Sequence, residues 1–205
     1  MLWLTGTWHP YNIRWQIDSR TFHIHRIFDV VMVEADGCSA DRRWEGIVHM
    51  YLYDMIVDTI VCMEGTEVIG TLLAQELTKG GFMSKNAHKT IYVIKPEFNS
   101  NSQIVFKDNY RAMINGKNVL ILTATVTTGL TINKAIEGVQ YYGGIIQGIS
   151  AVFSALENVN GIPIKSVFGL KDVPDYQYSD YRNCPLCKEG KKLDALINPY
   201  GYSKL

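Results

Sequence analysis

Residues 119–131 read Val-Leu-Ile-Leu-Thr-Ala-Thr-Val-Thr-Thr-Gly-Leu-Thr, and this stretch indicates the fold of the chain. The first four residues are apolar and predict a buried strand. Small hydroxyl residues and Gly129 follow the strand. Apolar residues at helical spacing then predict a helix from about residue 129 to residue 142, facing inward through Ile132, Ala135, Ile136 and Val139. A strand that runs through a short loop into an amphipathic helix is typical of an α/β protein.

The loop between this strand and this helix has the composition of a phosphate site. Gly129 lets the backbone turn tightly and come close to a ligand. The open N–H groups at a helix start, together with the positive end of the helix dipole, favour an anion. Thr127, Thr128 and Thr131 add hydroxyl donors. The alternative is a threonine-capped helix start that binds no ligand, and the residues by themselves leave both interpretations open.

The rest of the chain alternates predicted strands and amphipathic helices. The predicted strands cover residues 12–18, 58–63, 90–94, 118–123, 145–153 and 164–168. One further helix is predicted over residues 40–55, and another opens at Gly65 and stops at Gly80-Gly81. This order predicts a mostly parallel sheet with helices on both faces, which binds ligands at the carboxyl ends of its strands. We predict one domain over residues 1–174, with a small N-terminal region, and a C-terminal extension over residues 175–205 that packs on it.

Composition favours a globular protein without a nucleic-acid or membrane partner. Hydrophobic residues make up 47% of the chain and charged residues 20%, and 20 Lys and Arg balance 20 Asp and Glu. A balanced charge lacks the basic footprint of a nucleic-acid-binding protein. The apolar runs are short, and the N-terminus does not resemble a signal peptide. With four cysteines, these features predict a cytoplasmic protein whose thiols are reduced.

The loop sequence resembles the phosphoribosyl-diphosphate signature of type I phosphoribosyltransferases. That signature has four apolar residues, two acidic residues, a variable pair and then Thr-Thr-Gly-X-Thr, which this chain matches at residues 127–131. Three further segments, 61–76, 92–95 and 163–172, resemble the pyrophosphate-loop segment, the strand before the hood and the C-terminal strand of orotate phosphoribosyltransferases. The resemblance covers most of residues 45–172 and implies the fold of that family.

The resemblance also implies an activity and a set of site residues. The implied reaction transfers ribose 5-phosphate from phosphoribosyl diphosphate, the co-substrate, to a pyrimidine-type base such as orotate, in a homodimer. Lys95 is expected to meet the pyrophosphate, Glu64 to contact ribose or metal, and Thr123 and Ala124 to occupy the ribose positions. The implied phosphate-binding residues are Thr125, Val126, Thr127, Thr128, Gly129, Leu130 and Thr131.

The chain departs from the family where the chemistry is most demanding. The two acidic residues of the signature fall at Thr123 and Ala124. In the family, carboxylates at these two positions hold the ribose hydroxyls and help to organise Mg²⁺, which prefers oxygen ligands. Ile94 replaces a hood arginine, so that Lys95 is the remaining cation for the pyrophosphate. The sequence therefore predicts that Mg²⁺ binding is possible but weakened, and it assigns no residue of this chain as a metal ligand. It leaves two hypotheses, a transferase or a non-catalytic paralogue that binds a nucleotide or phosphoribosyl diphosphate.

Four other features keep two interpretations each. Glu64 is either a displaced catalytic carboxylate or an acid at a helix start. Cys184 and Cys187 have the spacing of a metal or redox pair, but a structural zinc site needs four ligands. His23 and His25 share one side of a strand-like run, as metal ligands or as an exposed edge. The tyrosine-rich tail, which includes Tyr200 and Tyr202, is expected to cover the core or a dimer partner rather than to stack on a base.

Overall fold

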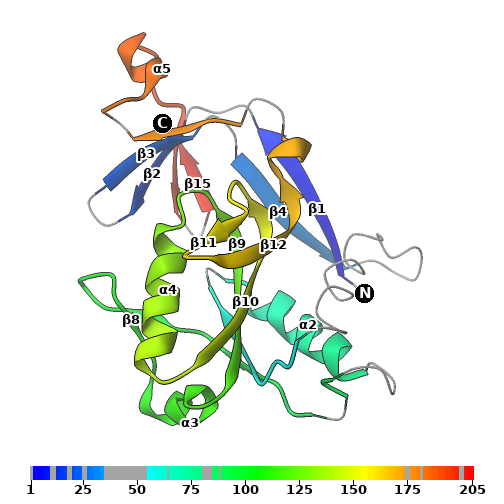
Figure 1. The fold of residues 1–205 in the computed structure, drawn as a ribbon. Helices are drawn as coiled ribbons and strands as arrows, with labels where there is room; N and C mark the ends of the chain where they lie inside the picture. Colours follow the sequence, from blue (N-terminus) through cyan, green and yellow to red (C-terminus); the bar gives the residue numbers. More distant parts are fainter. Residues whose placement is uncertain are drawn as a thin grey trace. The chain divides into compact units, whose positions relative to one another are not determined.

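The structure is a computed structural model that describes residues 2–9, 13–17, 20–24, 27–34, 55–63, 65–79, 85–87, 89–173, 176–180, 182–198 and 201–205. The chain divides into two compact units. One unit joins Met1–Asp41 to Val173–Leu205, and the other is Arg42–Asp172 (Figure 1). The second unit contains the loop at residues 127–131.

A six-stranded sheet forms the second unit. Its strands are β5 (Thr59–Cys62), β6 (Tyr92–Ile94), β9 (Asn118–Val126), β10 (Ile145–Ser154), β11 (Asn158–Val159) and β12 (Ile162–Gly169). They lie in the order β11-β12-β10-β9-β5-β6 (Figure 1). Every neighbouring pair is parallel except β11 with β12. The predicted α/β fold with a mostly parallel sheet is therefore confirmed.

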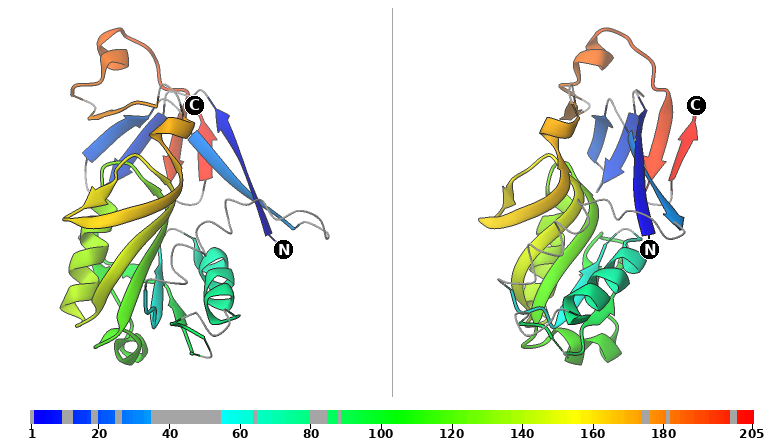
Figure 2. Two further views of the ribbon diagram at one scale, coloured as in Figure 1. Left: turned by 45° about the vertical axis from the view of Figure 1, so that its right-hand side comes forward. Right: turned by 90° about the vertical axis from the view of Figure 1, so that its right-hand side faces the viewer.

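Two long helices cover opposite faces of this sheet, α2 (Glu67–Lys79) and α4 (Leu130–Tyr141), as Figure 2 shows. Successive side chains along a strand point to opposite faces of the sheet, so that neighbouring residues of β9 pack against different helices. Ile121 belongs to the core under α4, together with Ile132 and Ile136. Leu122 and Cys62 face α2, where Gly70 leaves room for them. The inward-facing residues predicted for α4 are all buried: Ile132, Ala135, Ile136 and Val139.

Shorter elements lie between β6 and β9. A small hairpin pairs β7 (Glu97–Phe98) with β8 (Ile104–Val105). The 3-10 helix η1 (Asp108–Tyr110) and the one-turn helix α3 (Arg111–Ile114) then lead into the predicted turn at Asn115 and Gly116, where Gly116 has a φ of 66°. Ile114 anchors α3 because its side chain is fully buried. The other short elements of this unit are β11 and η2 (Leu170–Asp172).

The first unit is built from strands at both ends of the chain. β1 (Leu2–His9) pairs antiparallel with β4 (Ile27–Glu34). The order of its five-stranded sheet is β13-β3-β2-β14-β15. These strands are β2 (Ile13–Ile17), β3 (Arg20–Ile24), β13 (Tyr178–Asp180), β14 (Ala195–Asn198) and β15 (Gly201–Lys204). The tail thus pairs with the N-terminal hairpin, and the predicted division at residue 174 stays a prediction.

The predicted elements compare well with the described ones. Strands appear at each predicted position, and α2 and α4 match their predicted helices within two residues. The largest difference concerns β9, which continues to Val126 instead of ending at residue 123. Thr123, Ala124 and Thr125 are therefore strand residues. The helix predicted at 40–55 lies outside the described residues, apart from Met55, which is not helical. In the described part of the chain, no helix is both long and apolar enough to cross a membrane.

Candidate functional site

The predicted phosphate loop lies at the carboxyl end of β9, where the strand turns into α4. Gly129 is the residue before the helix, in a left-handed conformation with φ 76° and ψ 0°. As the N-cap residue of α4, Gly129 has no side chain that could cap the helix. The hydrogen bond from Leu130 N to Thr128 Oγ1 is long, at 3.5 Å, and Asn133 N donates to Gly129 O at 2.8 Å. The first N–H groups of α4 are thus positioned as donors for an anion.

Other side chains of the protein, and not open solvent, lie beside Gly129. A Cβ on Gly129 would lie 3.0 Å from Val159 Cγ2 and 3.2 Å from Leu156 Cδ1. Both neighbours belong to the segment that follows β10. This segment is tied to the end of β9, since Ala155 N donates to Val126 O at 2.8 Å. The glycine is therefore needed for the backbone conformation and for close packing, whereas its approach to a ligand stays a prediction.

The other predicted phosphate-binding residues differ in what they can offer. Val126 is 2% exposed and its side chain is in the core, so only its backbone is available to a ligand. The remaining side chains are half-buried, that of Thr125 at the end of β9 and the others in the loop and the first turn of α4: Thr127, Thr128, Leu130 and Thr131. The threonine hydroxyls can donate hydrogen bonds to phosphate oxygens.

The two positions that replace the acidic pair lie inside β9. Thr123 is fully buried and pairs in register with Ala151 of β10, and Ala124 is half-buried. Neither side chain carries a charge, and alanine has no hydrogen-bonding group. In the part of the chain that the structure describes, no three His, Cys, Asp or Glu side chains are grouped to hold a metal ion. The described residues around this loop therefore do not fit a protein-held Mg²⁺ ion.

The turn between β5 and α2 lies beside the end of β9. Met63 N donates to Leu122 O at 2.7 Å. The hydroxyl of Thr66 contacts the same carbonyl at 3.2 Å and the carbonyl of Met63 at 2.7 Å. These bonds bring the β5–α2 turn and the phosphate loop to one edge of the sheet, as parallel strands require. Glu64, which the sequence places in this turn, lies outside the described residues.

Lys95 follows β6 on the same edge and forms an ion pair with Glu67 in the first turn of α2. The Nζ–Oε1 distance is 2.6 Å, and the two side chains are 51% and 37% exposed. Burial raises the pKa of Glu67, but the hydrogen bond and charge of Lys95 outweigh it and lower that pKa below its ordinary value. Exposed ion pairs contribute at most about 1 kcal/mol. A polyanionic ligand can therefore compete with Glu67 for this cation.

Cys62 lies at the end of β5 with its side chain fully buried. Its burial raises the pKa of the thiol to about 12, so the thiol stays protonated near neutral pH. Gly70 packs so closely that a Cβ there would lie 2.3 Å from Cys62 Sγ. Cys62 is therefore a packing residue between β5 and α2.

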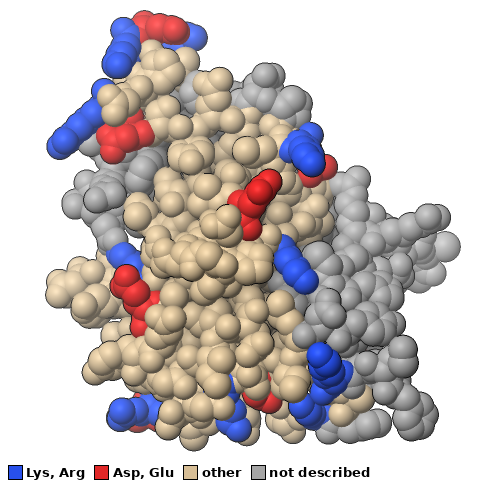
Figure 3. Space-filling view, in the orientation of Figure 1, with Lys and Arg blue, Asp and Glu red and all other residues tan. Residues whose placement is uncertain are grey.

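The remaining sequence candidates lie in the first unit. Cys184 is buried and directly precedes the short helix α5 (Pro185–Lys188), and Cys187 is exposed and is the third residue of that helix. No third metal-ligating side chain joins them among the described residues. His23 lies in β3, whereas His25 and Tyr200 are outside the described residues. Charged side chains on the face in Figure 3 are of both signs and are scattered over the described part of the chain.

Comparisons with known proteins place the similarity in part of the chain. No family model matches the sequence. A stretch of 83 residues is 33% identical to the orotate phosphoribosyltransferase of Thermus thermophilus, covering 40% of this chain and 43% of that protein. A stretch of 80 residues is 32% identical to the orotate phosphoribosyltransferase of Caldanaerobacter subterraneus subsp. tengcongensis, covering 38% and 40%. The matches thus span less than half the length of these curated relatives.

A solved structure aligns over a larger part of the chain. The hypoxanthine phosphoribosyltransferase of Trypanosoma cruzi aligns over 65% of this chain and 74% of its own length. The TM-score is 0.43 and the sequence identity is 15%.

Proposed function

We propose that this chain is a member of the type I phosphoribosyltransferase family, that it binds the 5′-phosphate of a ribosyl ligand at residues 127–131 and that it transfers the ribose 5-phosphate to a pyrimidine-type base. The observation that carries this proposal is the uncapped start of α4 beside Gly129. Open N–H groups and the helix dipole bind phosphate. The hydroxyls of Thr127, Thr128 and Thr131 add donors on the same loop.

The proposed transfer uses phosphoribosyl diphosphate as the donor. A ring nitrogen of the base forms a bond to the anomeric carbon and gives up its proton to water. The carbon–oxygen bond to the diphosphate breaks, and the diphosphate leaves with the electron pair. Lys95 supplies positive charge for that leaving group once the diphosphate displaces Glu67, because both anions compete for the same ammonium. Electrostatic stabilisation of this kind is the principal catalytic contribution that the described residues offer.

The second candidate function is ligand binding without turnover. Thr123 and Ala124 favour it, because neither residue supplies the carboxylate that would hold ribose hydroxyls or a metal. A carboxylate makes hydrogen bonds roughly twice as strong as those of a neutral group. Under this candidate the loop still binds a nucleotide or phosphoribosyl diphosphate. Under both candidate functions, we propose that the protein is a homodimer in the cytoplasm, as the sequence leads us to expect.

One pair of assays on the full chain separates the two candidates. The first assay follows orotate consumption with phosphoribosyl diphosphate and Mg²⁺. The second measures ligand-induced thermal stabilisation by ribose 5-phosphate and by phosphoribosyl diphosphate. Turnover supports the transferase, and stabilisation without turnover supports the binding protein. If neither phosphorylated ligand stabilises the chain, both proposals are wrong.

Variants of the loop then test whether the phosphate binds there. Thr128→Val and Thr131→Val each remove one hydroxyl donor and keep the side-chain shape. Loss of a hydrogen bond to a charged group costs about 1.5–3 kcal/mol, so ribose 5-phosphate should bind about tenfold more weakly or worse. Thr78→Val is the matched control, because Thr78 is a half-buried threonine whose hydroxyl donates to Ala74 O in α2. Equal binding by all three variants would place the ligand elsewhere.

A further inference from the structure

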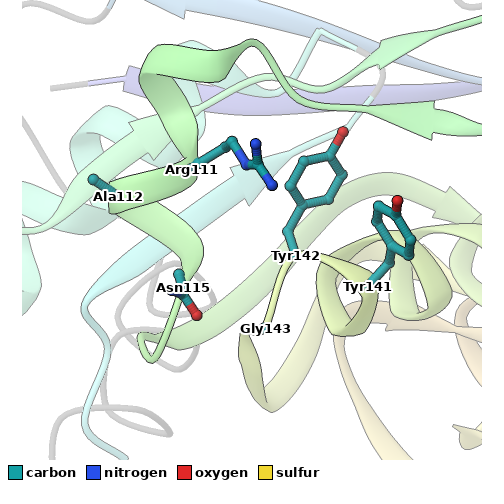
Figure 4. Close-up of a pocket in the computed structure, with 6 residues that line it drawn as sticks. All are labelled: Arg111, Ala112, Asn115, Tyr141, Tyr142 and Gly143. Carbon is teal, nitrogen blue, oxygen red and sulfur yellow. The ribbon is translucent and has the colours of Figure 1, made fainter.

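An open pocket of about 340 Å³ lies at the end of α4 opposite the phosphate loop. Its lining residues come from α3, from the turn before β9 and from the end of α4: Arg111, Ala112, Asn115, Tyr141, Tyr142 and Gly143 (Figure 4). These residues precede β9 and β10, so the pocket lies at the amino edge of the sheet. The 12 residues of α4 separate it from the loop by about 18 Å along the helix axis.

The floor of the pocket is fixed by main-chain bonds. Gly116 N donates to Gly143 O at 2.9 Å, which ties the turn before β9 to the end of α4. Gly143 has a φ of 80°, and a Cβ there would lie 2.5 Å from Asn115 Oδ1. The wall at α3 is held by the buried Ile114 and by a hydrogen bond from the Thr59 hydroxyl to Met113 O. These contacts fix the backbone beneath the pocket.

The ring of Tyr142 forms a rigid inner wall. It packs edge-to-face on Phe106 with the ring centroids 5.2 Å apart, and Phe106 N donates to the Tyr142 hydroxyl at 3.4 Å. The Arg111 guanidinium lies over this ring, with Cζ 5.9 Å from the centroid. A guanidinium beside an aromatic face is held by a cation–π interaction. Figure 4 shows Arg111 reaching from α3 toward Tyr142 in this arrangement.

Arg111 keeps most of its hydrogen-bonding capacity for a ligand. Its ion pair with Asp108 spans 3.9 Å from Nη1 to Oδ1, and the Asp108 side chain is 99% exposed. An exposed pair at that distance contributes little. The Arg111 side chain is 66% exposed, and its guanidinium presents a planar, forked set of hydrogen-bond donors. That fork matches the two oxygens of a carboxylate or phosphate.

Tyr141 and Asn115 supply the other half of the recognition. Tyr141 is 83% exposed, and its ring centroid lies 5.3 Å from that of Tyr142. An exposed aromatic ring at the rim of a pocket gains by stacking on a planar ligand. The side-chain amide of Asn115 is exposed at the pocket and offers both a donor and an acceptor. A cation, a stacking surface and an amide thus converge on one small volume.

We propose that this pocket binds a small planar ring that carries a carboxylate or a phosphate. The guanidinium of Arg111 binds the anionic group, Tyr141 stacks on the ring, and the amide of Asn115 contacts the edge of the ring. A volume of about 340 Å³ is at the lower end of the range for small-molecule sites, which suits a ligand no larger than a mononucleotide. This site is separate from the phosphate loop and does not rest on the proposed transfer.

Four probes test the ring and the anionic group of the proposed ligand separately. Orotate and uridine 5′-monophosphate carry both a ring and an anionic group, uridine has the ring alone, and ribose 5-phosphate has the anion alone. Amide chemical shifts of Gly116 and Gly143 report this pocket, whereas the amide of Gly129 reports the loop, so binding at the two edges is read separately. We expect orotate and uridine 5′-monophosphate to shift the amides of Gly116 and Gly143 at concentrations at least about tenfold lower than uridine and ribose 5-phosphate do. Uridine lacks the contact of the anionic group, and ribose 5-phosphate lacks the contact of the ring.

Two variants test the assigned residues. Arg111→Leu should weaken orotate binding about tenfold or more, and Tyr141→Ala about fivefold or more, since these are the usual losses for a charged hydrogen bond and for ring stacking. Lys85→Gln and Tyr178→Ala are matched controls that remove an exposed cation and an exposed tyrosine elsewhere. Thr128→Val should leave the pocket shifts unchanged.

The outcomes that overturn the proposal are equally specific. It is wrong if none of the four probes shifts Gly116 and Gly143, or if Arg111→Leu binds orotate as the unaltered chain does. Equal binding of ribose 5-phosphate and uridine 5′-monophosphate would reduce the pocket to a simple anion site and also contradict it. Amide spectra of each variant, compared with the unaltered chain, show whether the fold is retained.

Discussion

The two ends of α4 bring together different kinds of binding groups. At its start, the donors are backbone N–H groups and threonine hydroxyls, and Gly129 is fixed against Leu156 and Val159. At its end, the groups are the side chains of Arg111, Tyr141 and Asn115 on a fixed floor. A site made of backbone cannot be altered without disturbing the fold, whereas a site made of exposed side chains can. The two ends should therefore respond differently to mutation.

The core that connects both ends should give the largest effect. Ile136, a residue of α4, is 3% exposed and belongs to the core between that helix and the sheet. Ile136→Ala should lower the free energy of unfolding by about 2–5 kcal/mol, because a buried isoleucine leaves a cavity. Urea denaturation measures this loss. The ligand responses of the loop and of the pocket should weaken together, and an effect on one end alone would show that the two ends are not linked through α4.

Gly129 should give the next largest effect. Gly129→Ala strains a left-handed residue and places a Cβ 3.0 Å from Val159, whereas Gly116→Ala strains a similar φ with no atom within 4 Å. Both variants carry the backbone cost of about 1–2 kcal/mol. Crowding should make Gly129→Ala about 1 kcal/mol worse than Gly116→Ala in urea denaturation. Equal losses would mean that Leu156 and Val159 move aside.

The wall of the pocket should give a smaller effect. Tyr142→Phe keeps the edge-to-face contact with Phe106 and removes the hydroxyl that accepts from Phe106 N. The bond is long, at 3.4 Å, so the loss should be no more than about 1 kcal/mol in thermal denaturation. Orotate should still shift the amide of Gly143. A loss of that shift would show that the Tyr142 hydroxyl, and not its ring alone, serves the pocket.

The ion pair beside the loop should give the smallest effect on stability, with a defined pH dependence. The pKa of Glu67 is lowered in the folded chain. The contribution is therefore complete above the unfolded pKa of about 4.5 and is lost as pH falls through the lowered folded value. Solvent screening limits it to about 0.5 kcal/mol. Comparing urea denaturation of Glu67→Gln with that of the unaltered chain from pH 3 to pH 6 measures it, and parallel curves would contradict the assignment.

Glu67→Gln also bears on the loop. The change releases Lys95 from its carboxylate partner, so inorganic pyrophosphate should bind about two- to threefold more tightly near pH 7. Glu76→Gln is the matched control, because Glu76 lies further along α2. Calorimetric titration with pyrophosphate measures the change. Unaltered affinity would indicate that Lys95 does not meet the ligand.

Local signals explain which parts of the fold were predictable. The strand at β9 and the helix at α4 follow from apolar residues at periods of two and 3.6, and these patterns act over a few neighbouring residues. The extension of β9 to Val126 was missed because Thr and Ala at 123–125 interrupt the apolar run, although sheet pairing with β10 carries the strand on. The short pairings of β7 with β8 and of β11 with β12 gave no periodic pattern, since each has too few residues.

The strands of the first unit show the same limit at longer range. β13 and β14 pair with β3 and β2 from the opposite end of the chain. No pattern within the tail specifies such partners. The sequence therefore predicted an extension, but not the sheet that the tail shares with the N-terminal hairpin.

The sequence by itself determined the α/β sheet, the position of the loop and the loss of its acidic pair, because each depends on residue type at adjacent positions. Only the tertiary structure decided which distant side chains meet. Lys95 faces Glu67 because β6 lies next to β5, and Arg111 lies over Tyr142 because α3 and the end of α4 reach the same edge of the sheet. Such contacts depend on strand order and on the direction of helices across the sheet. These are properties of the whole packed unit, and no single segment encodes them.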